Sequence, residues 1–266
     1  MIKVIAIGDL HAEFPKLWRA LKASYAADEQ LMPTRPVREG DYRVILMGDL
    51  MHPKTLAEYR KLTGLEDYDP SNSQHLRLAA KAQIRELYRI KRYQEAALDQ
   101  VSILMGNHDH AVLTGSYVLG NKYLEHHEFH PEYGGLELPE DLKAWLEGFP
   151  HEVNIFGVNF AHVGPVPWLQ SYDDMFYNSR EPKEWWFTNP DYVTRMGYRF
   201  GVYGHTAMKD GILVKDQLAL IDALDRDQYL EMLLDEDLLE WRISEVPQPV
   251  KGQQAPGDAG TQGSLA

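Results

Sequence analysis

Five short segments of the chain each join an apolar run to a side chain that can bind a metal ion, and this recurrence limits the folds open to the sequence. In the first, the apolar run Val4–Ile7 leads through a glycine into Asp9 and His11. A short apolar run bounded by a turn residue is typical of a buried strand. The five motifs are GDLH at 8–11, GDLM at 48–51, GNHD at 106–109, AHVG at 161–164 and GHT at 204–206.

Helical and strand-like patterns alternate between these motifs, which predicts an α/β or mixed (α+β) protein. We expect residues 1–246 to form one domain, and the Gly-, Pro-, Gln- and Ser-rich segment 247–266 to be a disordered tail. Strands are expected at 3–7, 42–47, 101–105, 152–156, 158–163 and 200–203, followed by a meander of three or four strands over 211–244 with turns at 225–227 and 235–237; helices are expected at 15–27, 72–100 and 141–149.

Composition excludes several classes of function. The formal net charge of −13 opposes binding to nucleic acid or to an anionic membrane. The predicted helix 72–100 is rich in Lys and Arg, which indicates either a solvated face or a basic wall beside an anionic substrate. The absence of cysteine excludes disulfides, thiolate metal sites and cysteine nucleophiles. No apolar run reaches the ~18 residues of a membrane span, so we expect a soluble, cytoplasmic protein.

The motif side chains are oxygen and nitrogen donors, which suit Mn, Fe or Zn. Strand ends with short loops are where α/β proteins place ligands, so we expect the five motifs to converge on one edge of the sheet. Two divalent ions bring four positive charges, of which Asp9 and Asp49 would cancel half. The remainder can hold a phosphate dianion, and a metal-bridging hydroxide can attack its phosphorus in line.

The ordered series GDLH, GDLM, GNHD, AHVG and GHT resembles the calcineurin-like metallophosphoesterase superfamily. Within it, the chain is most similar to the branch that contains serine/threonine protein phosphatases and symmetrical diadenosine tetraphosphatases. The resemblance extends over residues 2–244 and includes the strand-like LALID at 218–222. It implies a four-layer αββα sandwich of two mixed sheets with two metal ions at one end.

The resemblance also implies a ligand for each motif. Asp9 and His11 would bind the first ion, Asp49 would bridge both ions, and Asn107, His162 and His205 would complete the second site. Mn is the first candidate for the metal, with Fe, Zn, Mg or Ni as alternatives. Some members of the superfamily carry a further histidine where this chain has Ala207, and in this respect the chain is similar to the protein-phosphatase branch.

Two further roles are implied in the same way. His108 would be the general acid that protonates the leaving oxygen, a role that its position beside Asn107 suits. Arg180, in the segment YNSREP, resembles an arginine that binds the substrate phosphate.

The second motif departs from the branch. Where the branch reads Asp-Arg-Gly, this chain has His52-Pro53-Lys54. His52 thus stands where an aspartate usually orients the catalytic histidine, unless it caps the loop and faces solvent. Lys54 could restore one positive charge, and Asp109 could instead be the partner of a histidine.

Two other groups are weaker candidates. The segment HHEFH, with His126, His127 and His130, has spacing that permits a metal site, but we expect an exposed loop. The pair Trp185–Trp186 could stack on a nucleobase, although a packed lid or core position is the simpler interpretation.

The sequence therefore predicts a metal-dependent phosphoester hydrolase that acts on a phosphomonoester, either a small molecule or a phosphoprotein. The alternative within the same class is a hydrolase of dinucleoside polyphosphates or other nucleotides, or a phosphodiesterase. A catalytically inactive binding scaffold is the alternative from a different class. Nucleic acid is not an expected partner because of the net charge.

Overall fold

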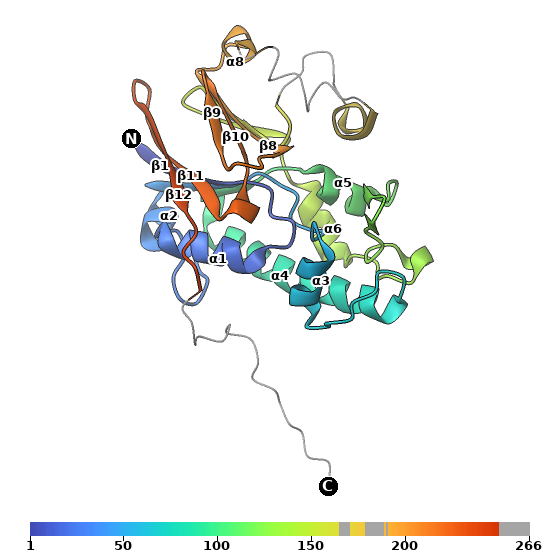
Figure 1. Ribbon diagram of the computed structural model, residues 1–266. Coiled ribbons are helices and arrows are strands. Elements are labelled where there is room, and N and C mark those ends of the chain that lie inside the picture. Colours follow the sequence, from blue (N-terminus) through green and yellow to red (C-terminus); the bar gives the residue numbers. More distant parts are fainter. Residues whose placement is uncertain (165–170, 179–188, 190, 250–266) are drawn as a thin grey trace.

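Two five-stranded mixed sheets pack face to face, and most helices gather on the outer side of the first sheet (Figure 1). The computed structural model describes residues 1–164, 171–178, 189 and 191–249. The predicted architecture of two mixed sheets with helices is confirmed. None of the helices in these ranges is long and apolar enough to cross a membrane.

The first sheet has the order β12-β11-β1-β2-β3. Strands β1, β2 and β3 are parallel to one another, and β3 forms one edge of the sheet. Strand β11 runs antiparallel to β1, and β12 runs antiparallel to β11. Ile7 lies opposite Leu46, and Leu46 opposite Ile103, so the parallel strands end level with one another. The bounds are β1 (Ile2–Ile7), β2 (Tyr42–Leu46), β3 (Val101–Ile103), β11 (Gln228–Leu234) and β12 (Leu239–Glu245).

The second sheet has the order β6-β7-β8-β10-β9, in which β7, β8 and β10 are parallel and the two edge strands are antiparallel to their neighbours. Its bounds are β6 (Glu152–Ile155), β7 (Val158–Ala161), β8 (Phe200–Ala207), β9 (Leu213–Lys215) and β10 (Leu218–Asp222). A separate hairpin pairs β4 (Gly120–Asn121) with β5 (Leu124–Glu125).

The helices differ greatly in length. Their bounds are α1 (Phe14–Ala23), α2 (Arg35–Glu39), α3 (Leu56–Thr63), α4 (Ser73–Ala96), α5 (Asn107–Thr114), α6 (Glu140–Glu147) and α8 (Tyr192–Arg195). Short 3₁₀ turns lie at Leu98–Gln100, Pro131–Tyr133 and Leu224–Arg226, and a π-helical turn at Asp174–Asn178.

Side-chain periodicity explains how these elements pack. In β1, Val4 and Ala6 face the second sheet, while Ile5 and Ile7 face the helices. In α1, Phe14, Leu17, Trp18 and Leu21 recur at helical spacing and are buried against the first sheet. On the other side of the sandwich, Tyr192 and Val193 of α8 pack on the outer face of the second sheet.

Some boundaries differ from the sequence prediction. The predicted helix 72–100 ends at Ala96, because Leu98 adopts a left-handed backbone that redirects the chain before β3. Its basic side chains Arg77, Lys81, Arg85 and Arg92 are exposed, which agrees with a solvated face. Helices α3 and α5 were not predicted, and β8 continues past Tyr203 to Ala207. Four strands and both turns are found in 211–244, but the predicted meander is wrong, because β9 and β10 belong to the second sheet whereas β11 and β12 belong to the first.

Candidate metal centre

The six side chains proposed as ligands lie together at the carboxyl ends of strands from both sheets. Asp9 and His11 follow β1, and Asp49 follows β2. The other three come from different elements: Asn107 is the first residue of α5, His162 follows β7, and His205 lies within β8. All are buried except the partly exposed His205. We call this group of six residues the metal centre.

Asp49 occupies the middle of the metal centre. Its Oδ2 atom lies 3.5 Å from Nε2 of His11 and 3.5 Å from Nε2 of His162. Its Oδ1 atom accepts a hydrogen bond of 2.8 Å from the backbone N–H of His108. One carboxylate oxygen therefore faces two imidazoles that belong to different strands.

Backbone carbonyls determine which nitrogen these imidazoles present. Nδ1 of His11 donates to the carbonyl of His52 at 3.2 Å, and Nδ1 of His162 donates to the carbonyl of Met47 at 2.7 Å. In a neutral ring, Nε2 is then left as a bare lone pair, the arrangement that metal-binding histidines use. Nε2 of His162 also lies 3.1 Å from Oδ1 of Asn107. Lone pairs that converge without hydrogens between them fit a bound cation, so the residues present suit divalent metal.

Asp9 and His205 close the other side of the centre. The backbone N–H of His205 donates to Oδ2 of Asp9 at 2.9 Å, and Nδ1 of His205 lies 2.9 Å from Oδ1 of Asn107. Burial raises the pKa of Asp9, and the neighbouring carboxylates Asp222 and Asp49 raise it further. A divalent ion would offset this concentration of negative charge.

The backbone at the centre is unusual. His11, Asp49 and His205 adopt φ values of 41°, 49° and 62°, in the left-handed region that costs non-glycine residues energy. The backbone at Gly204 also lies very close to the side chain of Asp9: a Cβ atom on Gly204 would lie 2.2 Å from Oδ1 of Asp9. Glycine is therefore required at 204 for Asp9 to keep its position.

Asp222 is a residue of this region that the sequence prediction missed. It ends β10, is 2% exposed, and lies in one group with Asp9 and His11. Its Oδ1 atom accepts from Nζ of Lys54 at 2.8 Å. Burial opposes the charge on Lys54, but Asp222 and Asp9 raise its pKa overall. The signal was present in LALID, an apolar strand that ends in an acid as the first motif does.

In the structure, the carboxylate of Asp109 binds backbone N–H groups rather than a histidine. Its Oδ1 atom accepts from the N–H of Leu50 at 2.9 Å, and its Oδ2 atom accepts from the N–H of Gly106 at 3.3 Å. Within the described residues it forms no hydrogen bond to a histidine, because both oxygens tie together the loops after β2 and β3. The idea that Asp109 partners a histidine is therefore wrong.

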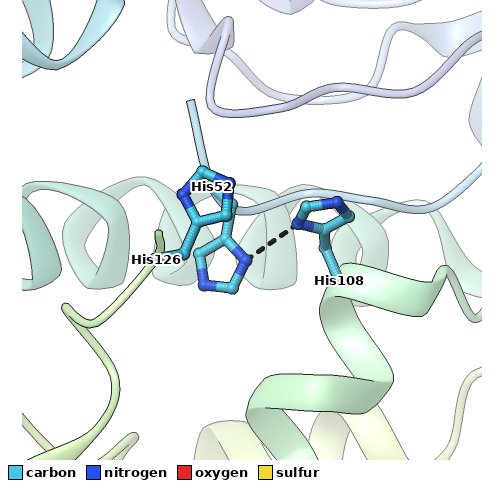
Figure 2. Close-up of side chains that lie close together, drawn as sticks. All are labelled: His52, His108 and His126. Carbon is cyan, nitrogen blue, oxygen red and sulfur yellow. Dashed lines mark hydrogen bonds between the residues drawn. The ribbon is translucent and has the colours of Figure 1, made fainter. Parts of the chain in front are cut away.

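His52 lies beside His108, as Figure 2 shows. The Nδ1 atoms of the two rings are 2.9 Å apart, and His52 is 1% exposed. The alternative in which His52 faces solvent is therefore wrong. Burial lowers the pKa of both imidazoles, and the neighbouring imidazoles, His126 among them, lower it further.

The segment HHEFH is not an exposed loop. His126 and His130 are 4% and 3% exposed, and the ring of His126 stacks on that of His52 at a centroid distance of 4.5 Å (Figure 2). The segment is buried because His126 binds the hydroxyl of Tyr59 in α3, a contact that no local pattern predicts. Arg180 and the pair Trp185–Trp186 lie outside the described residues.

Comparison with known proteins agrees with this geometry. The family model for calcineurin-like phosphoesterases matches residues 2–221. The chain belongs to the calcineurin-like phosphoesterase family. No curated protein matches the sequence.

Solved structures show how this family member relates to others in fold. A cold-active protein-tyrosine phosphatase of a psychrophile, Shewanella sp., is 15% identical with a TM-score of 0.58, and the match covers 93% of this chain and 81% of that one. A protein serine/threonine phosphatase from Saccharomyces cerevisiae is 10% identical with a TM-score of 0.53, over 94% of this chain and 82% of that one. At these identities the likeness concerns the fold.

Proposed function

We propose that the chain is a metal-dependent phosphoester hydrolase that binds two divalent ions at the metal centre and acts on phosphomonoesters. The position of Asp49 carries this proposal, since one oxygen faces the bare Nε2 atoms of His11 and His162 at equal distances of 3.5 Å. A carboxylate placed in this way suits a ligand shared by two ions.

We assign the surrounding residues to two sets about Asp49, as the family resemblance implies. Asp9 and His11 would hold one ion; Asn107, His162 and His205 would hold the other. When bound, the pair of ions neutralises phosphate charge and lowers the pKa of water enough to give a nucleophile near neutral pH. Mn is our first choice of metal, because the donors are carboxylate, amide and imidazole.

His108 would serve the leaving oxygen. Its backbone N–H is bound to Asp49, and its Nδ1 atom faces His52, so its Nε2 atom lies on the side of the ring away from His52. Lys54 adds a cation beside Asp222 at the same edge. A substrate phosphate would therefore meet positive charge on one side and a hydrogen-bond donor on the other.

The substrate belongs at this edge rather than at two hollows found elsewhere on the described surface. Those hollows, of about 310 and 500 Å³, lie at the opposite ends of the first sheet's parallel strands and are lined by residues such as Arg43 and Ser102. Neither contains a residue of the metal centre.

The proposal is tested by metal analysis and turnover of the full chain. The Mn-loaded protein should hold two ions and hydrolyse p-nitrophenyl phosphate and phosphopeptides. Preference for dinucleoside polyphosphates or bis-p-nitrophenyl phosphate would instead assign the nucleotide hydrolase or phosphodiesterase alternative. A protein without bound metal and without turnover on any of these compounds would be a binding scaffold.

A matched pair of variants locates the site. His162→Ala should lose metal and turnover, because His162 is 0% exposed within the centre. His130→Ala removes another buried histidine, 3% exposed, whose Nδ1 atom lies 3.2 Å from Oε1 of Glu132 instead. It should keep both ions, and equal metal loss in the two variants would contradict the assignment.

A further inference from the structure

A closed chain of hydrogen bonds and one ring stack adjoins His108. It runs from the backbone of His52 through side chains of α4, α3 and the segment after β5, and returns to the ring of His52. We call these five residues the relay. Its members are His52, Gln83, Glu128, Tyr59 and His126, and each is at most 4% exposed.

The direction of every hydrogen bond in the relay follows from one backbone group. The N–H of His52 can only donate, and it lies 2.9 Å from Oε1 of Gln83. The amide nitrogen of Gln83 therefore points the other way, where it donates to Oε1 of Glu128 at 2.9 Å. This oxygen of Glu128 is an acceptor.

The same oxygen accepts the hydroxyl hydrogen of Tyr59 at 2.6 Å. Because a tyrosine has one hydroxyl hydrogen, the oxygen of Tyr59 can only accept from Nδ1 of His126, which lies 2.8 Å away. His126 therefore carries its hydrogen on Nδ1, and the bond to Tyr59 fixes the plane of its ring.

His52 is held by this arrangement at three points. Its N–H is bound by Gln83, its carbonyl accepts from His11, and its ring is stacked on His126 with planes 5° apart. The remaining freedom of the ring is small, and its Nδ1 atom is directed at Nδ1 of His108 (Figure 2).

One hydrogen lies between those two Nδ1 atoms, and burial decides its owner. If neutral His52 accepted it, the hydrogen of His52 would sit on Nε2, which is buried without a hydrogen-bond partner among the described residues. A buried N–H without a partner is rare and costs about 1–3 kcal/mol, whereas an unused acceptor is tolerated better. His52 therefore donates, and the hydrogen of neutral His108 is on Nε2.

We propose that Gln83, Glu128, Tyr59 and His126 are positioning residues, which hold His52 as a donor to His108 and so keep the hydrogen of His108 on Nε2. The consequence of this arrangement for catalysis rests on the proposed function. The Nε2–H group of His108 is then aligned toward the leaving oxygen before substrate binds. The arrangement itself is a property of the folded chain and can be measured without turnover.

The first test is spectroscopic. Full-length protein labelled with ¹⁵N-histidine and loaded with diamagnetic Zn²⁺ is examined by two-bond ¹H–¹⁵N correlation at slightly alkaline pH. We expect the Nδ1–H tautomer for His126 and for His52, and the Nε2–H tautomer for His108. An Nε2–H tautomer at His126 or His52 would overturn the proposal whether or not the protein hydrolyses phosphate.

The second test is kinetic and uses a matched pair of tyrosines. Tyr59→Phe removes the relay hydroxyl. Tyr68→Phe is the control, because the ring of Tyr68 stacks on that of Tyr59 at a centroid distance of 4.7 Å. Tyr68 is 4% exposed, and its hydroxyl has no hydrogen-bond partner among the described residues. Tyr59→Phe should lower kcat on an alkyl phosphate about tenfold with little change in KM, because misalignment of a reacting group is costly. Tyr68→Phe should lower it by less than twofold.

A double variant separates positioning from general damage. In a His52→Ala background, Tyr59→Phe should have no further effect on kcat, because it acts through His52. Equal losses in the two tyrosine variants, or a full loss from Tyr59→Phe in that background, would contradict the positioning role. Expected tautomers in a protein without phosphatase activity would refute the proposed function and leave the relay assignment intact.

Discussion

Two clusters of buried polar side chains meet at His108, and they differ in how their hydrogen bonds are satisfied. In the relay, donors and acceptors alternate, so that each described bond pairs one hydrogen with one lone pair. In the metal centre, backbone donors and carbonyls satisfy the outer atoms, while the inner oxygens and nitrogens face one another at 2.9–3.5 Å.

This difference shows how burial of polar groups can be used in two ways. A chain of hydrogen bonds in which each hydrogen meets an acceptor fixes geometry, as in the relay. A set of converging lone pairs is unfavourable by itself and becomes favourable with a cation. The following predictions test this contrast, and they run from the largest expected effect to the smallest.

The largest effect is expected at Asp49, where the two halves of the metal centre meet. If Asp49 is shared by two ions, Asp49→Asn should remove the shared charge and therefore abolish turnover, with metal content reduced at both sites. Metal analysis and p-nitrophenyl phosphate hydrolysis measure the two effects. A variant with full activity and unchanged metal content would remove the basis for a shared ligand.

His108 should matter most for poor leaving groups. His108→Ala should lose about 10²–10⁴-fold on an alkyl phosphate, because an alkoxide needs a donor as it leaves. The loss should be smaller on p-nitrophenyl phosphate, whose leaving group is stable without one. Comparison of kcat/KM on the two esters, with metal content checked, measures this. Equal losses on both would argue against a role at the leaving oxygen.

Stability should respond in opposite directions in the two clusters when metal is absent. Gln83→Met in the relay leaves the N–H of His52 unpaired and removes one of the two hydrogen bonds to Oε1 of Glu128, so a loss of about 2 kcal/mol and a melting temperature lower by about 4–8 °C are expected. Asp9→Asn in the metal centre removes a buried charge and should raise the melting temperature by about 2–4 °C. Differential scanning calorimetry of the chelated proteins measures both.

The gain from Asp9→Asn should depend on pH. Burial raises the pKa of Asp9 in the folded state, so wild-type stability falls as the pH rises through that raised pKa. The advantage of Asn is therefore greatest above it and vanishes below the unfolded value of about 3.9. A lower melting temperature for Asp9→Asn at every pH would show that the centre is satisfied without metal.

The smallest effect concerns the pH dependence of the reaction. Burial, followed by the neighbouring His52, lowers the pKa of His108. His52→Asp replaces an imidazole with an anion, which stabilises a protonated His108 and should shift the alkaline limb of kcat/KM to higher pH. Identical alkaline limbs in both proteins would show that the His52 contact does not influence the titration that limits the rate.

The grouping of the six proposed ligands was largely predictable from the sequence, because each lies near the carboxyl end of a strand, with Asp9 and His11 after the same one. The motif around Asp9 can be read within eight residues, and the pairing of parallel strands then brings the motifs together. Asp222 carried the same signal. The relay was not predictable, since Tyr59 lies on an unpredicted helix and His126 on a segment without periodicity. Their contact joins residues 67 positions apart, and only tertiary packing creates it.

The left-handed backbone at the site has a consequence for engineering. His11, Asp49, His52 and His205 all have φ between 41° and 67°, and at each position a glycine would relax the main chain. A library screened only for expression or heat resistance should therefore enrich glycine at these four positions and deliver robust proteins that no longer act on substrate. Selection for activity has to accompany selection for thermostability, because the two selections favour different residues at these four positions.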